Sequence, residues 1–305
     1  MDDDELMGRA LALAATVRTT TSPNPWVGAA LLTAGGEVVG GATAPPGGPH
    51  AEAAALAAAG DRAAGATMAV TLEPCAHHGR TPPCADAVLA AGVRRVVVGV
   101  ADPDPRVAGR GIDRLRAAGV DVAVGVRAGE VAAQLAPYLK HRRTGRPWVV
   151  LKLAATMDGA TAAPDGSSRW ITGPAARADA HRLRAESDAV LVGAGTVRAD
   201  DPELTVRHVE GRDPLRVVLG VAPPGARVHP CVELKGEPAD VLDDLGRRGV
   251  LQVLVEGGAT VAGAFHRAGL VDRYVVYLAP ALVGGEGGRG LFAGPGAATI
   301  GDAWR

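Results

Sequence analysis

The feature that most constrains this chain is a set of three possible metal ligands, each where the pattern changes from strand to helix. His50 precedes an alanine-rich helical stretch, Cys75 follows an apolar strand, and Cys84 opens another helical stretch. Histidine nitrogen and cysteine thiolate are ligands that zinc prefers, and three protein ligands leave a fourth position open for water. The sequence therefore predicts an α/β fold with a zinc site formed by His50, Cys75 and Cys84.

Glu52, two residues after the histidine, favours a catalytic rather than a structural metal site. A carboxylate there can take a proton from water and deliver it to a leaving ammonia, as in nucleobase deaminases with H-x-E and P-C-x-x-C motifs. Here eight residues instead of two separate Cys75 from Cys84. Each ligand lies near a predicted helix N-terminus, whose dipole favours thiolate. A structural zinc site with His77 or His78 as fourth ligand, or an unmetallated cysteine pair, are the alternatives.

The composition indicates which kinds of molecule this protein binds. The 305 residues suggest two domains. With 32 basic and 33 acidic residues, the chain lacks the basic excess of nucleic-acid-binding proteins, so a small-molecule substrate and no nucleic-acid partner are expected. Only one of three cysteines lies outside the predicted metal site, and the N-terminus is acidic, which favours a cytoplasmic protein. No apolar run is long enough to predict a membrane span.

The hydrophobic pattern divides the chain into two α/β series, joined near Thr144-Gly145-Arg146-Pro147. We expect domains at 1–144 and 147–305. In the first half, the pattern predicts a helix around 6–17, strands at 27–32, 37–41, 67–72, 94–100 and 121–126, and helices at 51–59, 84–91, 111–118 and 130–143. In the second half, it predicts strands at 148–155, 188–192, 215–219, 251–255 and 273–278, helices at 174–186 and 260–268, and an ordered glycine-rich loop at 284–296.

Three further features each allow two interpretations. Asn24, between two prolines, is either a partner for a pyrimidine amide edge or a turn residue. His77, in the loop between the cysteines with His78 and Arg80, is either a contact for a ribose phosphate or solvated surface. Glu256-Gly257-Gly258, between an apolar strand and a helix, either holds a phosphate with backbone amides or simply reverses the chain.

The chain resembles the bifunctional deaminase–reductases of riboflavin biosynthesis over nearly its whole length. Besides the zinc motif, the resemblance rests on Thr21-Ser22-Pro23-Asn24-Pro25, Asp102-Pro103-Asp104-Pro105, Val107-Ala108-Gly109-Arg110-Gly111, Lys152-Leu153-Ala154-Ala155-Thr156-Met157-Asp158-Gly159, Ser168-Arg169-Trp170-Ile171-Thr172, Thr196-Val197-Arg198-Ala199-Asp200-Asp201-Pro202 and Val255-Glu256-Gly257-Gly258-Ala259-Thr260. It implies a cytidine-deaminase-like three-layer domain followed by a dihydrofolate-reductase-like domain. The implied reactions are zinc-dependent deamination of 2,5-diamino-6-ribosylamino-4(3H)-pyrimidinone 5′-phosphate and reduction of the ribosyl side chain by NADPH.

The resemblance also implies site residues in the second half and a homo-oligomer. NADP contacts are implied at Ala154, Trp170, Thr196, Asp200, Gly258, Ala259, Thr260, Val261, Ala262, Gly263 and Ala264. Substrate contacts are implied at Ser168, Arg184, Leu204, Arg207 and Glu256. Among these, Arg184 and Arg207 suit a phosphate, because a guanidinium fork matches phosphate oxygens.

Three departures from the family pattern concern the reductase half. Gly220-Val221 replaces an Asp and a small polar residue, and 223–240 is rich in Pro, Gly and charge where the family has another strand. The sequence ends at 302–305, before a further strand pair of the family. A deaminase whose reductase-like domain is inactive and serves binding or oligomerisation is therefore an alternative. A nucleic-acid or free-nucleoside deaminase conflicts with the neutral charge, and a non-catalytic zinc scaffold conflicts with Glu52.

Overall fold

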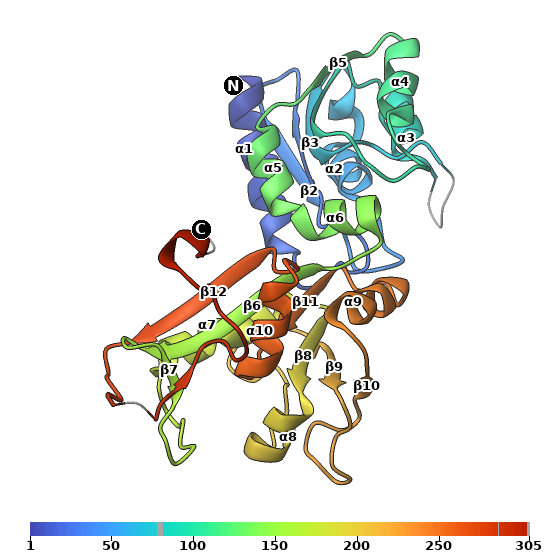
Figure 1. The fold of residues 1–305 in the computed structure, drawn as a ribbon. Helices are drawn as coiled ribbons and strands as arrows, with labels where there is room; N and C mark the ends of the chain where they lie inside the picture. The colour runs from blue at the N-terminus through green and yellow to red at the C-terminus, as the bar shows by residue number, and fades with distance from the viewer. Residues whose placement is uncertain (78–81, 286, 304–305) are drawn as a thin grey trace. The chain divides into compact units, whose positions relative to one another are not determined.

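A computed structural model describes residues 1–77, 82–285 and 287–303. The chain divides into two compact units, Met1–Gly145 and Arg146–Arg305, and each is built on its own β-sheet (Figure 1). Within the described ranges, no helix has both the length and the apolar character needed to cross a membrane.

The first unit contains a five-stranded sheet in the order β2-β1-β3-β4-β5. Its strands are β1 (Gly28–Leu32), β2 (Val38–Ala42), β3 (Thr67–Leu72), β4 (Arg95–Val100) and β5 (Asp121–Val124). Its helices are α1 (Asp3–Thr16), α2 (Ala51–Ala59), η1 (Gly60–Ala63), α3 (Cys84–Ala90), α4 (Arg110–Ala117), α5 (Ala128–Gln134) and α6 (Ala136–Thr144). Because β3, β4 and β5 run parallel, their carboxyl ends open on one edge of the sheet.

Two glycines let α1 and α2 pack closely on opposite faces of this sheet. A Cβ on Gly28 would lie 2.0 Å from the carbonyl oxygen of Ala10 in α1, and one on Gly41 would lie 2.4 Å from that of Ala51 in α2. Gly41 pairs with Ala29, the residue after Gly28. Paired residues share a face and successive residues alternate, so the helices lie on different faces. The predicted three-layer arrangement is confirmed.

Gly28→Ala should destabilise the protein by about 1–3 kcal/mol, because the added methyl group overpacks the contact between α1 and β1. Urea denaturation would measure the loss. Gly129→Ala is the matched control, since an added Cβ at Gly129 in α5 meets nothing within 4 Å. We expect the control to be neutral or slightly stabilising. Equal stability of the two variants would show that helix and sheet can separate at no cost.

The single helix predicted over 130–143 is wrong. The segment forms two helices, α5 and α6, which meet at Leu135. Pro137 lies in the first turn of α6. Since proline has no N–H to continue the hydrogen bonding of α5, the chain starts a new helix there. The new direction buries Tyr138 and Leu139.

The second unit contains a six-stranded sheet in which every pairing is parallel, in the order β10-β9-β8-β11-β6-β12. Its strands are β6 (Trp148–Thr156), β8 (Ala189–Gly193), β9 (Leu215–Leu219), β10 (Val232–Leu234), β11 (Gln252–Val255) and β12 (Arg273–Ala279). A separate antiparallel pair joins β7 (Ala160–Ala162) to β13 (Arg289–Gly290). The helices are α7 (Pro174–Ala185), α8 (Ala194–Asp200), α9 (Pro238–Arg247), α10 (Ala259–Arg267) and η2 (Ile300–Asp302).

The order of strands brings polar segments together at one edge of this sheet. Strand β11 lies between β6 and β8, so the carboxyl ends of β8 and β11 are neighbours. Open α/β sheets bind ligands at such a point, where the strand order reverses. The core beneath is built mainly from valine, leucine and alanine, with Phe265 fully buried.

The expectation that 223–240 lacks a strand of the family is wrong. Strand β10 lies in this segment and pairs with β9, with Val232 opposite Val217. Gly220 has a φ of +113°, and its N–H donates to the carbonyl of Leu234. Residues with side chains rarely adopt that conformation, so the glycine at the end of β9 is a requirement of the turn.

Candidate functional site

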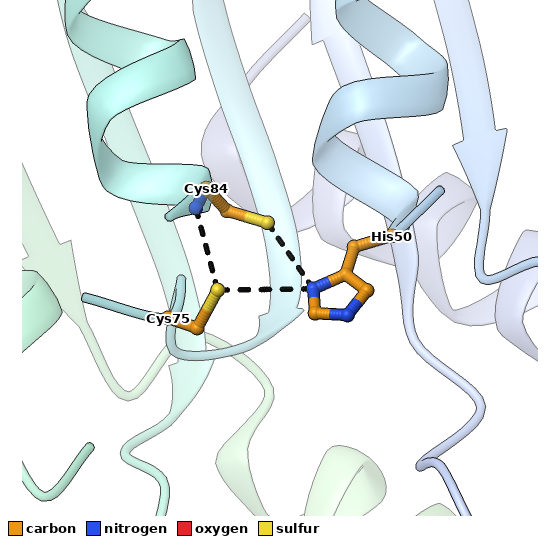
Figure 2. Close-up of side chains that lie close together, drawn as sticks. All are labelled: His50, Cys75 and Cys84. Carbon is orange, nitrogen blue, oxygen red and sulfur yellow. Dashed lines mark hydrogen bonds between the residues drawn. The ribbon is translucent and has the colours of Figure 1, made fainter. Parts of the chain in front are cut away.

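The three predicted zinc ligands meet at the edge of the first sheet (Figure 2). His50 is the N-cap of α2, Cys75 follows β3, and Cys84 is the first residue of α3. His50 Nδ1 lies 3.3 Å from Cys84 Sγ and 3.8 Å from Cys75 Sγ. One ligand atom from each residue lies within 4.8 Å of the others. The donor set and its spacing fit a zinc ion with an open fourth position.

The two cysteines differ in pKa, so that Cys75 favours the thiolate form and Cys84 the thiol form. The backbone N–H of Cys84, at the start of α3, donates to Cys75 Sγ at 3.3 Å. Cys75 itself lies in a loop, but the N-terminus of α3 reaches its sulfur, as expected for a ligand near a helix N-terminus. A hydrogen bond from the Cys84 thiol lowers the pKa of Cys75 to about 4. The same hydrogen bond and burial raise the pKa of Cys84. The Cys84 thiol and the N-terminus of α3 therefore favour the thiolate form of Cys75, which is the form that binds zinc.

Glu52 lies in the first turn of α2 and is 4% exposed. Burial raises the pKa of its carboxyl group to about 7. A group with a pKa near neutrality can both accept and release a proton. Its position two residues after His50 places this group in the same cavity as the ligands.

A cavity of about 470 Å³ contains the metal site and two further predicted residues. Asn24 and His77 both line it, together with Glu52 and ligands His50 and Cys75. His78 and Arg80, considered for the same role, lie outside the described residues. The cavity also has a side that the sequence did not predict, formed by Asp102, Asp104, Arg106, Val107, Tyr138 and Arg142.

Glu73 connects the segment that carries Cys75 to the second side of the cavity. Its carboxylate is 3% exposed and accepts four backbone N–H groups, those of Asp102, Gly109, Gly111 and Ile112. All four belong to the connection between β4 and the start of α4. A carboxylate with four donors fixes that connection beside Pro74-Cys75. Glu73 therefore positions the cavity wall.

Glu73→Gln should destabilise the protein by about 1–3 kcal/mol, because the amide directs an NH₂ group at backbone donors and leaves some of them unpaired. Urea denaturation would measure the change. Glu37→Gln is the control, since Glu37 pairs with Arg62 on the surface, where its side chain is 56% exposed, and should change stability by less than ~0.5 kcal/mol. Similar losses in both variants would mean that the four hydrogen bonds to Glu73 contribute no more to the free energy of unfolding than a surface ion pair.

The sequence contains a signal for one part of the cavity side that was not predicted. Asp102-Pro103-Asp104-Pro105 follows β4, which lies parallel to β3, so its carboxyl end had to lie near Cys75. Asp102 accepts the hydroxyl of Tyr138 at 3.0 Å, and burial raises the pKa of Asp102. Nothing in the sequence indicated Tyr138 or Arg142, because only the packing of α6 brings them to the cavity.

In the second unit, the structure brings together several residues with predicted NADP roles. The N–H of Gly258, the N-cap of α10, donates to Thr196 Oγ1 at 2.9 Å. Arg169 donates to the carbonyl of Asp200 and lies beside Trp170, whose side chain is exposed. Residues Ala259, Thr260, Val261, Ala262, Gly263 and Ala264 form the first turns of α10, while Ala154 lies on β6.

The predicted substrate residues of this unit include a buried ion pair. Arg184 donates from Nε and Nη2 to both oxygens of Glu256, at 2.5 and 2.9 Å. Arg207 bonds to Glu203 and Thr205. Leu204 packs in the core at 2% exposure, so only its backbone could reach a ligand. Ser168 lies in the loop after β7 and is partly exposed.

Comparisons with known proteins agree with this architecture. Residues 1–100 match the cytidine and deoxycytidylate deaminase zinc-binding region, and residues 147–301 match the RibD C-terminal domain. The riboflavin biosynthesis protein RibD of Escherichia coli is 44% identical and aligns over 99% of this chain and 94% of its own.

Two solved structures resemble the whole chain. RibD of Acinetobacter baumannii superposes with a TM-score of 0.92 at 38% identity, over 99% of this chain and 93% of its own. The diaminohydroxyphosphoribosylaminopyrimidine deaminase/5-amino-6-(5-phosphoribosylamino)uracil reductase of Thermotoga maritima has a TM-score of 0.86 at 36% identity, over 95% and 89%. This chain therefore belongs to the RibD family, the bifunctional deaminase–reductases of riboflavin biosynthesis.

Proposed function

We propose that residues 1–144 deaminate a phosphoribosylated diaminopyrimidinone at the site formed by His50, Cys75 and Cys84. The observation that carries this proposal is the convergence of these three ligands beside a cavity that is lined by His50, Cys75 and buried Glu52. Zinc in such a site supplies activation of a water molecule at neutral pH. Glu52 accepts a proton from that water and delivers it to the departing ammonia. Asn24 and His77 orient the pyrimidine and the ribose phosphate.

Residues 147–305 reduce the ribosyl side chain of the deaminated product. NADPH supplies the hydride. We assign its contacts to Thr196 and the Gly258–Ala264 segment, where helix N-terminal amides suit a phosphate group, and to Ala154, Trp170 and Asp200. Ser168, Arg184, Leu204, Arg207 and Glu256 are assigned to the substrate. One argument for an inactive reductase was a missing strand in 223–240, and this argument no longer holds because β10 is present.

We also propose that the enzyme works in the cytoplasm and as a homo-oligomer. All three cysteines are free, which suits a reducing compartment. The family resemblance supports the oligomer, and analytical ultracentrifugation of the zinc-replete protein tests it. A monomer at micromolar concentration would refute this part of the proposal.

Product analysis tests both activities in one experiment. Zinc-replete protein is incubated with 2,5-diamino-6-ribosylamino-4(3H)-pyrimidinone 5′-phosphate, with and without NADPH. We expect the deaminated compound alone without NADPH and its ribitylamino form when NADPH is present. Deaminated product that persists with NADPH would overturn the assignment of the reductase residues. No ammonia release in either case would overturn the deaminase assignment.

A further inference from the structure

Two arginines line the deaminase cavity and take no part in zinc binding or proton transfer. Arg106 belongs to the connection between β4 and α4, and Arg142 lies on α6. The same cavity is lined by His50 and Glu52. A substrate whose base reacts at Glu52 therefore has two guanidinium groups within the same enclosure.

Both arginines share one carboxylate, that of Asp104. Arg106 donates to it from Nε at 3.0 Å and from Nη2 at 2.7 Å, and Arg142 Nε lies 3.5 Å from its Oδ2. The hydrogen bond from Arg106 lowers the pKa of Asp104 to about 2, so this carboxylate stays charged. Two cations against one anion leave the cluster with a surplus positive charge.

The other carboxylates of the cavity wall do not cancel this surplus by pairing with the arginines. Glu73 is engaged by four backbone N–H groups. Asp102 accepts the Tyr138 hydroxyl and the N–H of Asp104. Neither carboxylate hydrogen-bonds to Arg106 or Arg142 in the described residues, so the guanidinium groups remain donors for an anionic group of a ligand.

The contacts of Arg142 orient its guanidinium and leave a donor for an anionic group of a ligand. Its guanidinium lies 5.0 Å from the centre of the Tyr138 ring, a cation–π contact that orients the plane. Its Nε is buried and has no hydrogen-bond acceptor within the described part of the chain. This Nε has Asp104 as an ion-pair partner at 3.5 Å but makes no hydrogen bond to it, and a ligand oxygen would supply the missing hydrogen bond. Arg106 bonds to Asp104 through Nε and Nη2, and among the described residues nothing bonds to its Nη1.

We propose that Arg106 and Arg142 bind the 5′-phosphate of the pyrimidine substrate in the deaminase unit and so determine its preference for a phosphorylated substrate. The inference rests on the proposed function, since it takes a phosphoribosyl compound as the ligand. Guanidinium groups match phosphate oxygens in geometry and charge. Asp104 positions both arginines and does not contact the phosphate.

Steady-state deamination by zinc-replete protein tests this assignment with two substrates, the 5′-phosphate and its dephosphorylated riboside. The variants are Arg106→Met, Arg142→Met and, as the matched control, Arg143→Met, which removes the same charge from an exposed position of α6 outside the cavity lining. We expect kcat/KM for the phosphate to fall about 10- to 100-fold in the first two variants and to stay unchanged in the control. Activity on the riboside should be the same in all four proteins.

Inhibition by inorganic phosphate provides a second measurement on the same proteins. Phosphate should compete with substrate in the wild type and in Arg143→Met, and more weakly in Arg142→Met. Equal losses on both substrates would assign the arginines a structural role and overturn the proposal, as would no loss on either. A wild type that deaminates neither compound would instead refute the proposed function, so the two failures are distinguishable.

Discussion

Glu52→Gln is expected to lower the rate of deamination by about 10²–10⁴-fold while the protein keeps its zinc. The amide has nearly the shape of the carboxyl group but cannot accept and release a proton. Because Glu52 is buried and two residues from a ligand without being one, zinc binding should survive. Ammonia release and zinc content, measured on the same preparation, give both quantities.

Two comparisons make this result specific. Cys75→Ser should lose zinc and activity together, because it removes a ligand. The Glu52→Gln protein should reduce deaminated substrate with NADPH at the wild-type rate, since the reductase unit is separate. Wild-type ammonia release by zinc-replete Glu52→Gln would exclude Glu52 as the proton carrier.

Arg184→Met is expected to destabilise the protein by about 3–5 kcal/mol, because it leaves Glu256 as an unpaired buried charge. The two side chains are only 12% and 9% exposed. Burial opposes the charged form of Glu256, but the charge and hydrogen bonds of Arg184 hold its pKa below the usual value. Urea denaturation at neutral pH would measure the loss.

The effect should depend on pH in a defined direction. The lowered pKa of Glu256 means that the pair stabilises the wild type above the ordinary glutamate pKa, and this stabilisation is lost as the pH falls. Without Arg184, burial favours protonated Glu256, so the gap between variant and wild type should narrow on acidification. Adding Glu256→Gln to Arg184→Met should recover part of the loss at neutral pH.

Arg182→Met is the matched control for this pair. Arg182 lies on the same helix and forms ion pairs with Asp179 and Glu186, but its side chain is 44% exposed. Exposed pairs contribute about 0–1 kcal/mol, so this variant should stay close to the wild type. A loss in Arg184→Met no larger than in Arg182→Met would mean that water reaches the Glu256 carboxylate.

The zinc ligands could be predicted because their signal is local. His50, Cys75 and Cys84 stand where strands end and helices begin, and such junctions at one edge of a parallel sheet meet in space. Strand β9 was predicted with the bounds it has, since Leu215–Leu219 is apolar at every position except Arg216 and lies between polar segments.

Other features depend on the tertiary structure, or on sequence signals that compete with one another. Pro137 indicates a break before α6, but the helix-forming residues on either side of it favour one continuous helix. Helix α9 was missed, although Val241, Leu242 and Leu245 follow a helical period after Pro238. The role of Glu73 could not be predicted, because its four donors lie about 30–40 residues away along the chain and nothing in their sequence names an acceptor.

The position of β11 also dictates the order in which the second unit can be completed. Trp148 at the start of β6 pairs with Gln252, and Val190 in β8 pairs with Leu254. During synthesis, β6 and β8 therefore leave the ribosome long before the strand that joins them. Until then, the edge of each strand that pairs with β11 has unpaired backbone N–H and C=O groups, which are sites for wrong pairing. We expect this unit to fold slowly, after release of its centre strand, and to need protection from aggregation while the chain is being made.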